Sequence, residues 1–238
     1  MDLSVVVPVL NEAENIPGLV GEIRAALDGK LDYEIVYVDD GSTDDSVAVL
    51  RRLAAASPML RLVRHGARSG QSAAIRTGVK AARGPWIATL DGDGQNDPAD
   101  IPLLWAARDA TGADALLLVA GQRQKRRDSW SKRWASRIAN RVRAFLLDDQ
   151  TPDTGCGLKL FPRALFLELP YFDHMHRFLG ALVIRAGGRV RSVPVNHRPR
   201  LRGASKYGVL DRLWVGISDL AGVMWLKRRS QRPTVEEG

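Results

Sequence analysis

The sequence has little cysteine and no long apolar run. Its single cysteine, Cys156, excludes an intrachain disulfide framework and a metal site built from several cysteines, which suits a reducing compartment. No apolar stretch approaches the roughly 18–20 residues of a membrane-spanning helix. The N-terminal stretch "MDLSVVVPVLNE" also lacks the basic flank of a signal peptide. With 238 residues, 45% of them hydrophobic, the chain is expected to fold as one large α/β domain or as one domain with an appendage.

Several motifs of known enzyme classes are also absent. No G-x-G-x-x-G occurs, which weakens a dinucleotide-binding interpretation, and no G-x-x-x-x-G-K-[ST] occurs, which excludes a P-loop enzyme. No G-x-S-x-G surrounds a candidate nucleophile. His174 and His176 lie close together in "DHMHRF", but no further Cys/His cluster supports a zinc site.

Charge is distributed unevenly along the chain. Residues 1–120 carry 11 Lys/Arg and 17 Asp/Glu, a net charge of −6, whereas residues 121–238 carry 24 and 10, a net charge of +14. Residues 121–145 alone contain nine basic residues and one acidic residue. A run of charge is often only a solvated helix face. An acidic half followed by a basic half instead favours an anionic partner, namely nucleic acid, an anionic membrane surface or a phosphorylated substrate.

Strand and helix patterns alternate over the first half. Short apolar strands are predicted at residues 3–7, 34–38, 60–64, 86–90 and 115–120, with helices at 14–27, 45–55, 72–82 and 98–108. Continuous apolar strands between amphipathic helices indicate a mostly parallel sheet flanked by helices. After residue 120 we expect helices at 129–147, 177–186 and 210–225, and strands after "DTGCG" and at 190–195. The polar clusters follow the first four strands, where such sheets bind ligands.

The stretch "ATLDGDGQNDP" follows the fourth predicted strand. Asp91 and Asp93 stand on alternate residues and can face one cation, with Gln95 as a neutral oxygen ligand. Carboxylates with open positions left for phosphate oxygens suit Mg²⁺ or Mn²⁺. The alternative is a polar turn that caps the helix at Pro98, and we expect Asp97 to be that cap.

Two further acids, Asp39 and Asp40, end the second strand in "VDDGSTDD". A capped turn would explain the residues that follow them, but not two consecutive acids at the strand end itself. Their carboxylates could accept hydrogen bonds from a nucleobase or a ribose.

Four motifs in order, "SVVVPVLNEAENI", "YEIVYVDDGSTDDS", "RSGQSAAIRTGVKAARGPWIATLDGDGQNDP" and "DTGCGLKLFPR", resemble family 2 (GT-A fold) inverting glycosyltransferases. The resemblance covers about residues 3–208 and is strongest to the branch of dolichyl- and polyprenyl-phosphate sugar transferases. It implies a Rossmann-like GT-A fold and a nucleotide-sugar site of Pro8, Leu10, Glu12, Asp39, Asp40, Gln71, Asp91, Gly92 and Asp93. It also implies Asp91, Asp93 and Gln95 as the ligands of Mg²⁺ or Mn²⁺.

The basic half then suits an acceptor that is itself a phosphate. Such an acceptor is ionised near neutral pH and needs no general base, but basic side chains must offset the repulsion between two anions. The resemblance implies an acceptor-phosphate site of Arg123, Arg133, Ser136, Arg202, Ser205 and Lys206. It implies catalytic roles for Asp93, Arg123, Arg133 and Lys206.

We therefore predict a catalytic domain over residues 1–208, with a nucleotide-sugar half (1–120) and an acceptor half (121–208), and a C-terminal amphipathic, basic helix and tail over 209–238. The final helix either packs on the core or lies at a membrane interface, with Trp and basic residues near anionic lipid. We expect a cytoplasmic enzyme in peripheral contact with the inner membrane face, directly or through a separate membrane protein.

Two other functions compete with this prediction. Transfer to a sugar hydroxyl of a glycan or cell-envelope polysaccharide would need a base, and Asp153 is the good candidate. A nucleic-acid-binding module would use the basic half, but that half lacks an aromatic stacking pattern and the acidic half would repel phosphates. Nucleic acid is therefore not an expected partner.

Overall fold

We analysed a computed structural model of the whole chain. It describes residues 1–112, 114–124, 146–147, 151–199 and 209–231, with side chains from residue 216 onward in the last segment. The predicted helix at 129–147 lies outside the described residues except at its last two positions. The same holds for the acceptor-side residues Arg133, Ser136, Arg202, Ser205 and Lys206.

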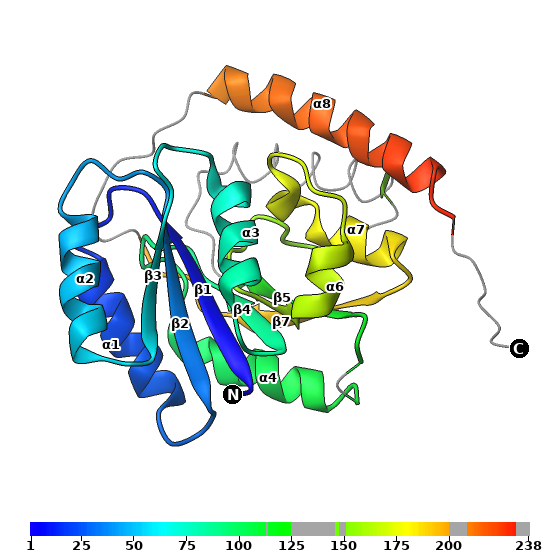
Figure 1. Cartoon of the computed structure of the whole chain (residues 1–238). Helices are drawn as coiled ribbons and strands as arrows, with labels where there is room; N and C mark the ends of the chain where they lie inside the picture. The colour runs from blue at the N-terminus through cyan, green and yellow to red at the C-terminus, as the bar shows by residue number, and fades with distance from the viewer. Residues whose placement is uncertain (113, 125–145, 148–150, 200–208, 232–238) are drawn as a thin grey trace, which may run out of the picture.

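A seven-stranded sheet forms the centre of the molecule (Figure 1). Its strands are β1 (Leu3–Val9), β2 (Tyr33–Asp39), β3 (Leu60–Arg64), β4 (Trp86–Thr89), β5 (Leu117–Arg123), β6 (Lys159–Pro162) and β7 (Arg189–Val195). They lie in the order β3-β2-β1-β4-β6-β5-β7. β6 pairs antiparallel with β4 and β5, and every other pairing is parallel.

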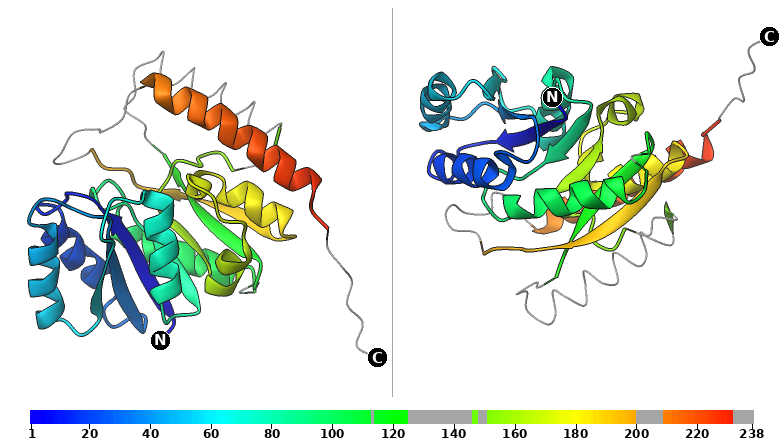
Figure 2. Two further views of the ribbon diagram at one scale, coloured as in Figure 1. Left: turned by 45° about the horizontal axis from the view of Figure 1, so that its top comes forward. Right: turned by 90° about the horizontal axis from the view of Figure 1, so that it is seen from below.

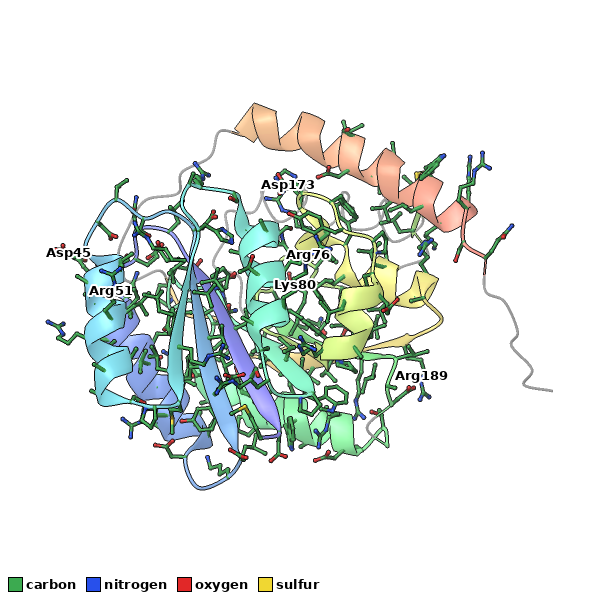
Figure 3. All side chains as sticks on the ribbon, viewed as in Figure 1. Asp45, Arg51, Arg76, Lys80, Asp173 and Arg189 are labelled. Carbon is green, nitrogen blue, oxygen red and sulfur yellow. The ribbon has the colours of Figure 1, made fainter. Side chains whose placement is uncertain are left out.

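Helices cover both faces of this sheet (Figures 1 and 2). They are α1 (Ile16–Leu27), α2 (Ser46–Ala56), α3 (Gln71–Ala81), α4 (Ile101–Asp109), α6 (Arg163–Glu168), α7 (Leu179–Arg185) and α8 (Val209–Arg228), with short 3₁₀ turns η1 (Pro98–Asp100) and η2 (Met175–Arg177). Alternate residues of a strand point to opposite faces. Val5 and Val7 therefore pack with α1 and α4, whereas Val6 packs with α3 and α7. Charged side chains such as Arg51, Lys80 and Arg189 lie on the outside (Figure 3).

The predicted α/β architecture is confirmed. The first four strands and the helices between them fall within a few residues of their predicted positions. The strand expected after "DTGCG" is β6, and its antiparallel direction makes the sheet mostly, not entirely, parallel. Helix α6 was not predicted, because its six residues are too few for a clear helical period.

The C-terminal helix α8 is both packed and exposed. It runs alongside α7 (Figure 2), where Val223 is fully buried and Arg185 Nε donates to the Leu226 carbonyl at 2.9 Å. On its outer side Ile217 and Trp225 are 50% and 60% exposed. Among the described helices, none is long and apolar enough to cross a membrane. The division into domains at residue 208 stays a prediction.

Candidate active site

The site lies where the direction of strand addition reverses. From β1 the chain adds β2 and β3 on one side and then returns to place β4 on the other side. Open α/β sheets bind ligands at such a switch point, beyond the carboxyl ends of the strands. Here Leu10 follows β1 and Asp91 follows β4, so the topology brings the first and fourth polar clusters of the sequence together.

The turn after β4 is held by its own side chains. The Asp91 backbone N–H donates to Asn96 Oδ1 at 3.1 Å, and the Gln95 backbone N–H donates to Asp93 Oδ1 at 3.1 Å. Gly94 has a φ of +74°, a left-handed conformation that favours glycine. The result is a fixed loop on which Asp91 and Asp93 stand close enough to repel each other electrostatically.

Asp91 is half-buried at this strand end. Burial, and then the negative charge of Asp93, raise the pKa of Asp91 to about 6. Among described residues its side chain has one hydrogen bond, from Gln71 Nε2 at 2.8 Å. A carboxylate with so little compensation is destabilised in its charged form, and a bound cation would relieve that destabilisation.

The "TGCG" segment packs directly behind Asp91. A side chain at Gly157 would collide with the Asp91 carboxylate and the Asn96 amide, so only glycine allows this approach. The neighbouring Cys156 is buried, and burial raises the pKa of its thiol. Asn96 Nδ2 lies 3.9 Å from its sulfur. Cys156 is therefore a small packing residue, and its protonated thiol is no nucleophile.

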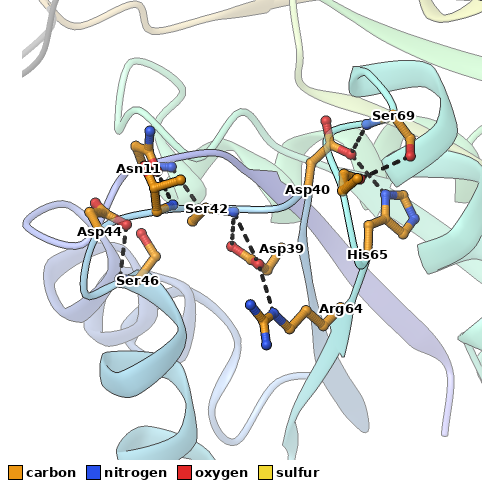
Figure 4. Close-up of polar contacts among 11 residues, drawn as sticks. Asn11, Asp39, Asp40, Ser42, Asp44, Ser46, Arg64, His65 and Ser69 are labelled. Atoms are coloured by element: carbon orange, nitrogen blue, oxygen red, sulfur yellow. Dashed lines mark hydrogen bonds and ion pairs between the residues drawn. The ribbon is translucent and has the colours of Figure 1, made fainter.

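The second acidic turn is fully engaged within the protein (Figure 4). Asp40 accepts the backbone N–H groups of Ser69 and Gly70, each at 2.8 Å, and contacts His65 Nδ1 at 2.8 Å. Asp39 accepts the Ser42 N–H and pairs with Arg64 at 3.6 Å. Both acids are buried, and they fix the loops around the predicted nucleotide site. Their contact with the nucleotide itself stays a prediction.

The "NE" segment after β1 is tied to that turn. Asn11 adopts a left-handed conformation, with a φ of 55°. Its backbone N–H donates to Ser42 Oγ at 2.8 Å, and its side-chain oxygen accepts the Thr43 N–H at 2.8 Å. Glu12 donates its backbone N–H to Ser46 Oγ at 3.0 Å. The first two motifs therefore form one rigid unit.

On the predicted acceptor side, Arg123 ends β5 and pairs with Asp153. Arg123 Nε and Nη2 donate to the two carboxylate oxygens at 2.6 and 2.7 Å, and its backbone N–H donates at 3.2 Å. Both side chains are largely buried. This bidentate pair joins the two residues that were predicted for alternative reactions, Arg123 to bind the acceptor phosphate and Asp153 to act as a base on a sugar hydroxyl.

Asp97 caps η1 as predicted, with Oδ1 accepting the Ala99 N–H at 3.1 Å. It also forms an ion pair with Arg198. Arg198 in turn pairs with Glu22 of α1, and its backbone carbonyl lies 3.5 Å from Gln95 Nε2. Arg198, which follows β7, is thus held beside the Asp91–Asp93 turn.

Sequence reasoning missed two groups at the site. Lys159 lies in β6 at 5% exposure and donates to the carbonyls of Thr154 and Cys156. A charged residue between buried leucines in "GLKLF" was the available signal. His176 bonds to Ser72 at 2.7 Å, whereas its sequence neighbour His174 pairs with Asp219. Each histidine therefore has a partner other than a metal.

Comparison with known proteins identifies the family. The sequence model described as Glycosyl transferase family 2 matches residues 4–169. The chain belongs to this family. It is 34% identical over 238 residues to a dodecaprenyl-phosphate galacturonate synthase of Rhizobium johnstonii, an alignment that covers 98% of this chain and 69% of the relative. It is 37% identical over 212 residues to an undecaprenyl-phosphate 4-deoxy-4-formamido-L-arabinose transferase of Edwardsiella ictaluri, covering 87% of this chain and 63% of the relative.

These relatives confirm the resemblance to the polyprenyl-phosphate branch. Solved structures confirm the glycosyltransferase fold. A Mycobacterium tuberculosis glucosyl-3-phosphoglycerate synthase with Mn²⁺ and UDP-glucose has a TM-score of 0.68 at 21% identity, covering 95% of this chain and 78% of that one. A Pyrobaculum calidifontis mannosyltransferase with GDP-Man and Mn²⁺ has a TM-score of 0.67 at 23% identity, covering 97% and 65%.

Proposed function

We propose that this glycosyltransferase moves a sugar from a nucleoside-diphosphate sugar to a polyprenyl phosphate. The observation that carries the proposal is the half-buried, weakly compensated Asp91 beside Asp93 at the switch point, next to a chain half of net charge +14. The Asp91–Asp93 turn suits a cation and a diphosphate, and the basic half of the chain suits an anionic acceptor. Both relatives named above act on polyprenyl phosphates by name, but on different sugars.

A divalent cation, Mg²⁺ or Mn²⁺, fits the residues present. Within the described residues no cluster of three or more His, Cys, Asp or Glu side chains converges on one point. Asp91 and Asp93 would therefore supply two carboxylates and leave the other positions to diphosphate oxygens and water, as Mg²⁺ sites commonly do. The bound ion would neutralise charge on the leaving diphosphate. Gln95 as a third ligand stays a prediction.

In the reaction we propose, an acceptor-phosphate oxygen forms a bond to the anomeric carbon while the bond from that carbon to the diphosphate breaks. Configuration inverts, and the nucleoside diphosphate leaves with the bonding electrons. The acceptor phosphate is ionised near neutral pH, so no side chain has to remove a proton. Arg123, with the predicted Arg133, Ser136, Arg202, Ser205 and Lys206, would hold the two anions together.

The bond between Arg123 and Asp153 disfavours transfer to a sugar hydroxyl. A carboxylate that pairs bidentately with a guanidinium is a poorer base than an isolated one. Arg123 has further N–H donors available for a phosphate. If Asp153→Asn abolished turnover while Arg133→Ala left it nearly intact, the hydroxyl acceptor would be favoured instead.

We place the enzyme at the inner face of the membrane in peripheral contact. The outer side of α8 supports this, because Ile217 and Trp225 are exposed together with Arg228 and Arg229. Apolar and basic residues on one helix suit the surface of an anionic bilayer. A separate membrane protein is the alternative partner for the same surface.

Incubation with undecaprenyl phosphate, Mg²⁺ or Mn²⁺, and a panel of UDP- and GDP-sugars tests the proposal. The expected result is a lipid-linked sugar from one donor, and loss of that product on chelation with EDTA. No lipid-linked product with any donor would contradict it.

A further inference from the structure

A cavity of about 260 Å³ lies beside Asp91. Its donor-side wall includes Pro8, Gln71 and Asp91. Lys159, His176 and Arg177 form a basic wall of the same cavity. Pockets for drug-sized ligands typically have roughly 300–1,000 Å³. This cavity is therefore suited to one part of a nucleotide sugar, such as the sugar ring, and not to the whole molecule.

Lys159 brings a buried positive charge to the cavity. Its ammonium group donates to two backbone carbonyls, at 3.3 Å for Thr154 and also to Cys156. In the described parts of the chain no carboxylate lies within ion-pair distance of it. Carbonyl groups satisfy the N–H donors but carry no net charge, so burial lowers the pKa of Lys159 and the more distant charges of Asp91 and Asp153 offset this only in part. An anion from a ligand would offset the cost of burying this charge.

Arg177 adds a second cation to the same wall. It lies in η2 and is half-buried. Its guanidinium forms neither a hydrogen bond nor an ion pair with any residue that the structure describes. A guanidinium in a cavity presents a planar set of N–H donors that matches a carboxylate bidentately.

His176 completes the wall as a neutral donor. Its backbone N–H donates to Ser72 Oγ at 3.4 Å, and the same hydroxyl bonds Nδ1 at 2.7 Å. In the tautomer in which Ser72 donates to Nδ1, the ring proton lies on Nε2 and can be donated to a ligand. Burial, together with the charges of Lys159 and Arg177, lowers the pKa of His176 to about 3, so the ring stays neutral.

From this wall we infer that the cavity holds the sugar of the donor and selects a sugar that carries a carboxylate, that is, a nucleoside-diphosphate uronate. Arg177 and Lys159 would bind the carboxylate, and His176 would donate to a sugar oxygen. The inference rests on the proposed function. It is consistent with the charge balance, since Asp91 is the one carboxylate among the described lining residues, and a divalent cation bound there would leave Lys159 and Arg177 for the ligand.

The acceptor phosphate is the other anion that could enter. The lining favours the donor sugar instead. Pro8 and Gln71 line the same cavity as Arg177, and the family resemblance assigns Pro8 and Gln71 to the nucleotide-sugar site. Of the residues predicted to bind the acceptor phosphate, the structure describes the side chain of Arg123, which pairs with Asp153 and is not among the lining residues.

Thermal stabilisation in the presence of Mn²⁺ tests the inference. UDP and GDP first establish which nucleotide binds. The matched pairs UDP-galacturonate and UDP-galactose, or GDP-mannuronate and GDP-mannose, then measure selectivity. We expect the uronate to bind about 10-fold more tightly or better, as for charge-assisted hydrogen bonds. Arg177→Leu should abolish this preference while binding of the free nucleotide is retained, and Arg177→Lys should keep part of it.

Arg189→Leu is the matched control. Arg189 lies at the opposite end of the sheet, on the first residue of β7, and pairs with Asp114 (Figure 3). Its replacement should leave the selectivity unchanged. Equal affinity for uronate and neutral sugar would overturn the inference. So would an Arg177→Leu variant that keeps the preference but binds farnesyl phosphate more weakly. Absence of stabilisation by any nucleotide would contradict the proposed function as well.

Discussion

Two acidic turns stand at the same edge of the sheet and are built in opposite ways. After β2, Asp40 accepts two backbone N–H groups and contacts His65, so the protein itself compensates its charge. After β4, Asp91 accepts one side-chain amide among the described residues and faces the charge of Asp93. Two turns with similar sequence therefore differ in what they leave for a ligand.

The two turns therefore have different roles: the turn after β2 holds the surrounding loops in place, whereas the turn after β4 leaves a charge for a ligand. Asp40 fixes the loop at residues 65–70, from which Gln71 starts α3 and reaches Asp91. Asp91 keeps a weakly compensated charge, which destabilises the folded protein until a cation is bound. Uncompensated groups of this kind are typical of functional sites.

Asp91→Asn should have the largest effect on activity. The variant keeps the acceptor for Gln71 but loses the charge for the cation, and we expect transfer to fall by roughly 10²–10³-fold, as when one electrostatic partner of a transition state is removed. Its melting temperature without metal should not fall, because repulsion from Asp93 is relieved. Initial rates and thermal unfolding with and without Mn²⁺ check both parts. A large loss of metal-free stability would show that Asp91 also has a structural role.

Gly157→Ala should come next, because it disturbs Asp91 through packing alone. The added Cβ would overlap the Asp91 carboxylate and the Asn96 amide, and overpacking of this kind costs about 1–3 kcal/mol. We expect roughly 10-fold weaker activation by Mn²⁺, measured as the metal concentration for half-maximal rate. Gly18→Ala on α1, where a Cβ meets nothing within 4 Å, is the control and should behave like the unaltered protein.

The strands and polar clusters of the N-terminal half could be predicted well from the sequence. Continuous apolar strands such as residues 3–9 and 33–39 are local signals, and each polar cluster follows its strand directly. The cavity wall depends instead on contacts distant in sequence. The bond between Ser72 and His176 spans 104 residues, and the pair between Arg123 and Asp153 spans 30. No periodicity reports such distances, so the place of His176 in the cavity could be assigned only from the structure, whereas Lys159 had a local signal as a charged residue within an apolar strand.

Asp40→Asn tests the acidic turn after β2. An amide nitrogen would face a backbone N–H of Ser69 or Gly70, and an unpaired buried donor costs about 1–3 kcal/mol. The free energy of unfolding in urea should fall by that amount. Asp45→Asn, at an exposed position without a capping hydrogen bond, should change it by less than about 0.5 kcal/mol. If both variants unfolded like the unaltered protein, the contrast between the two turns would not hold.

A pH series on His176→Asn extends the comparison to the basic wall of the cavity. The folded protein lowers the pKa of His176 from 6.5 to about 3, so between these values the unfolded chain binds the extra proton. Stability should therefore fall as the pH drops below 6.5, by about 1–2 kcal/mol between pH 7 and pH 5 from this residue. The variant lacks the titrating ring and should lose correspondingly less over the same interval. Urea unfolding at both pH values measures the two losses, and equal losses would mean that the His176 ring is solvated and does not line the cavity as a neutral donor.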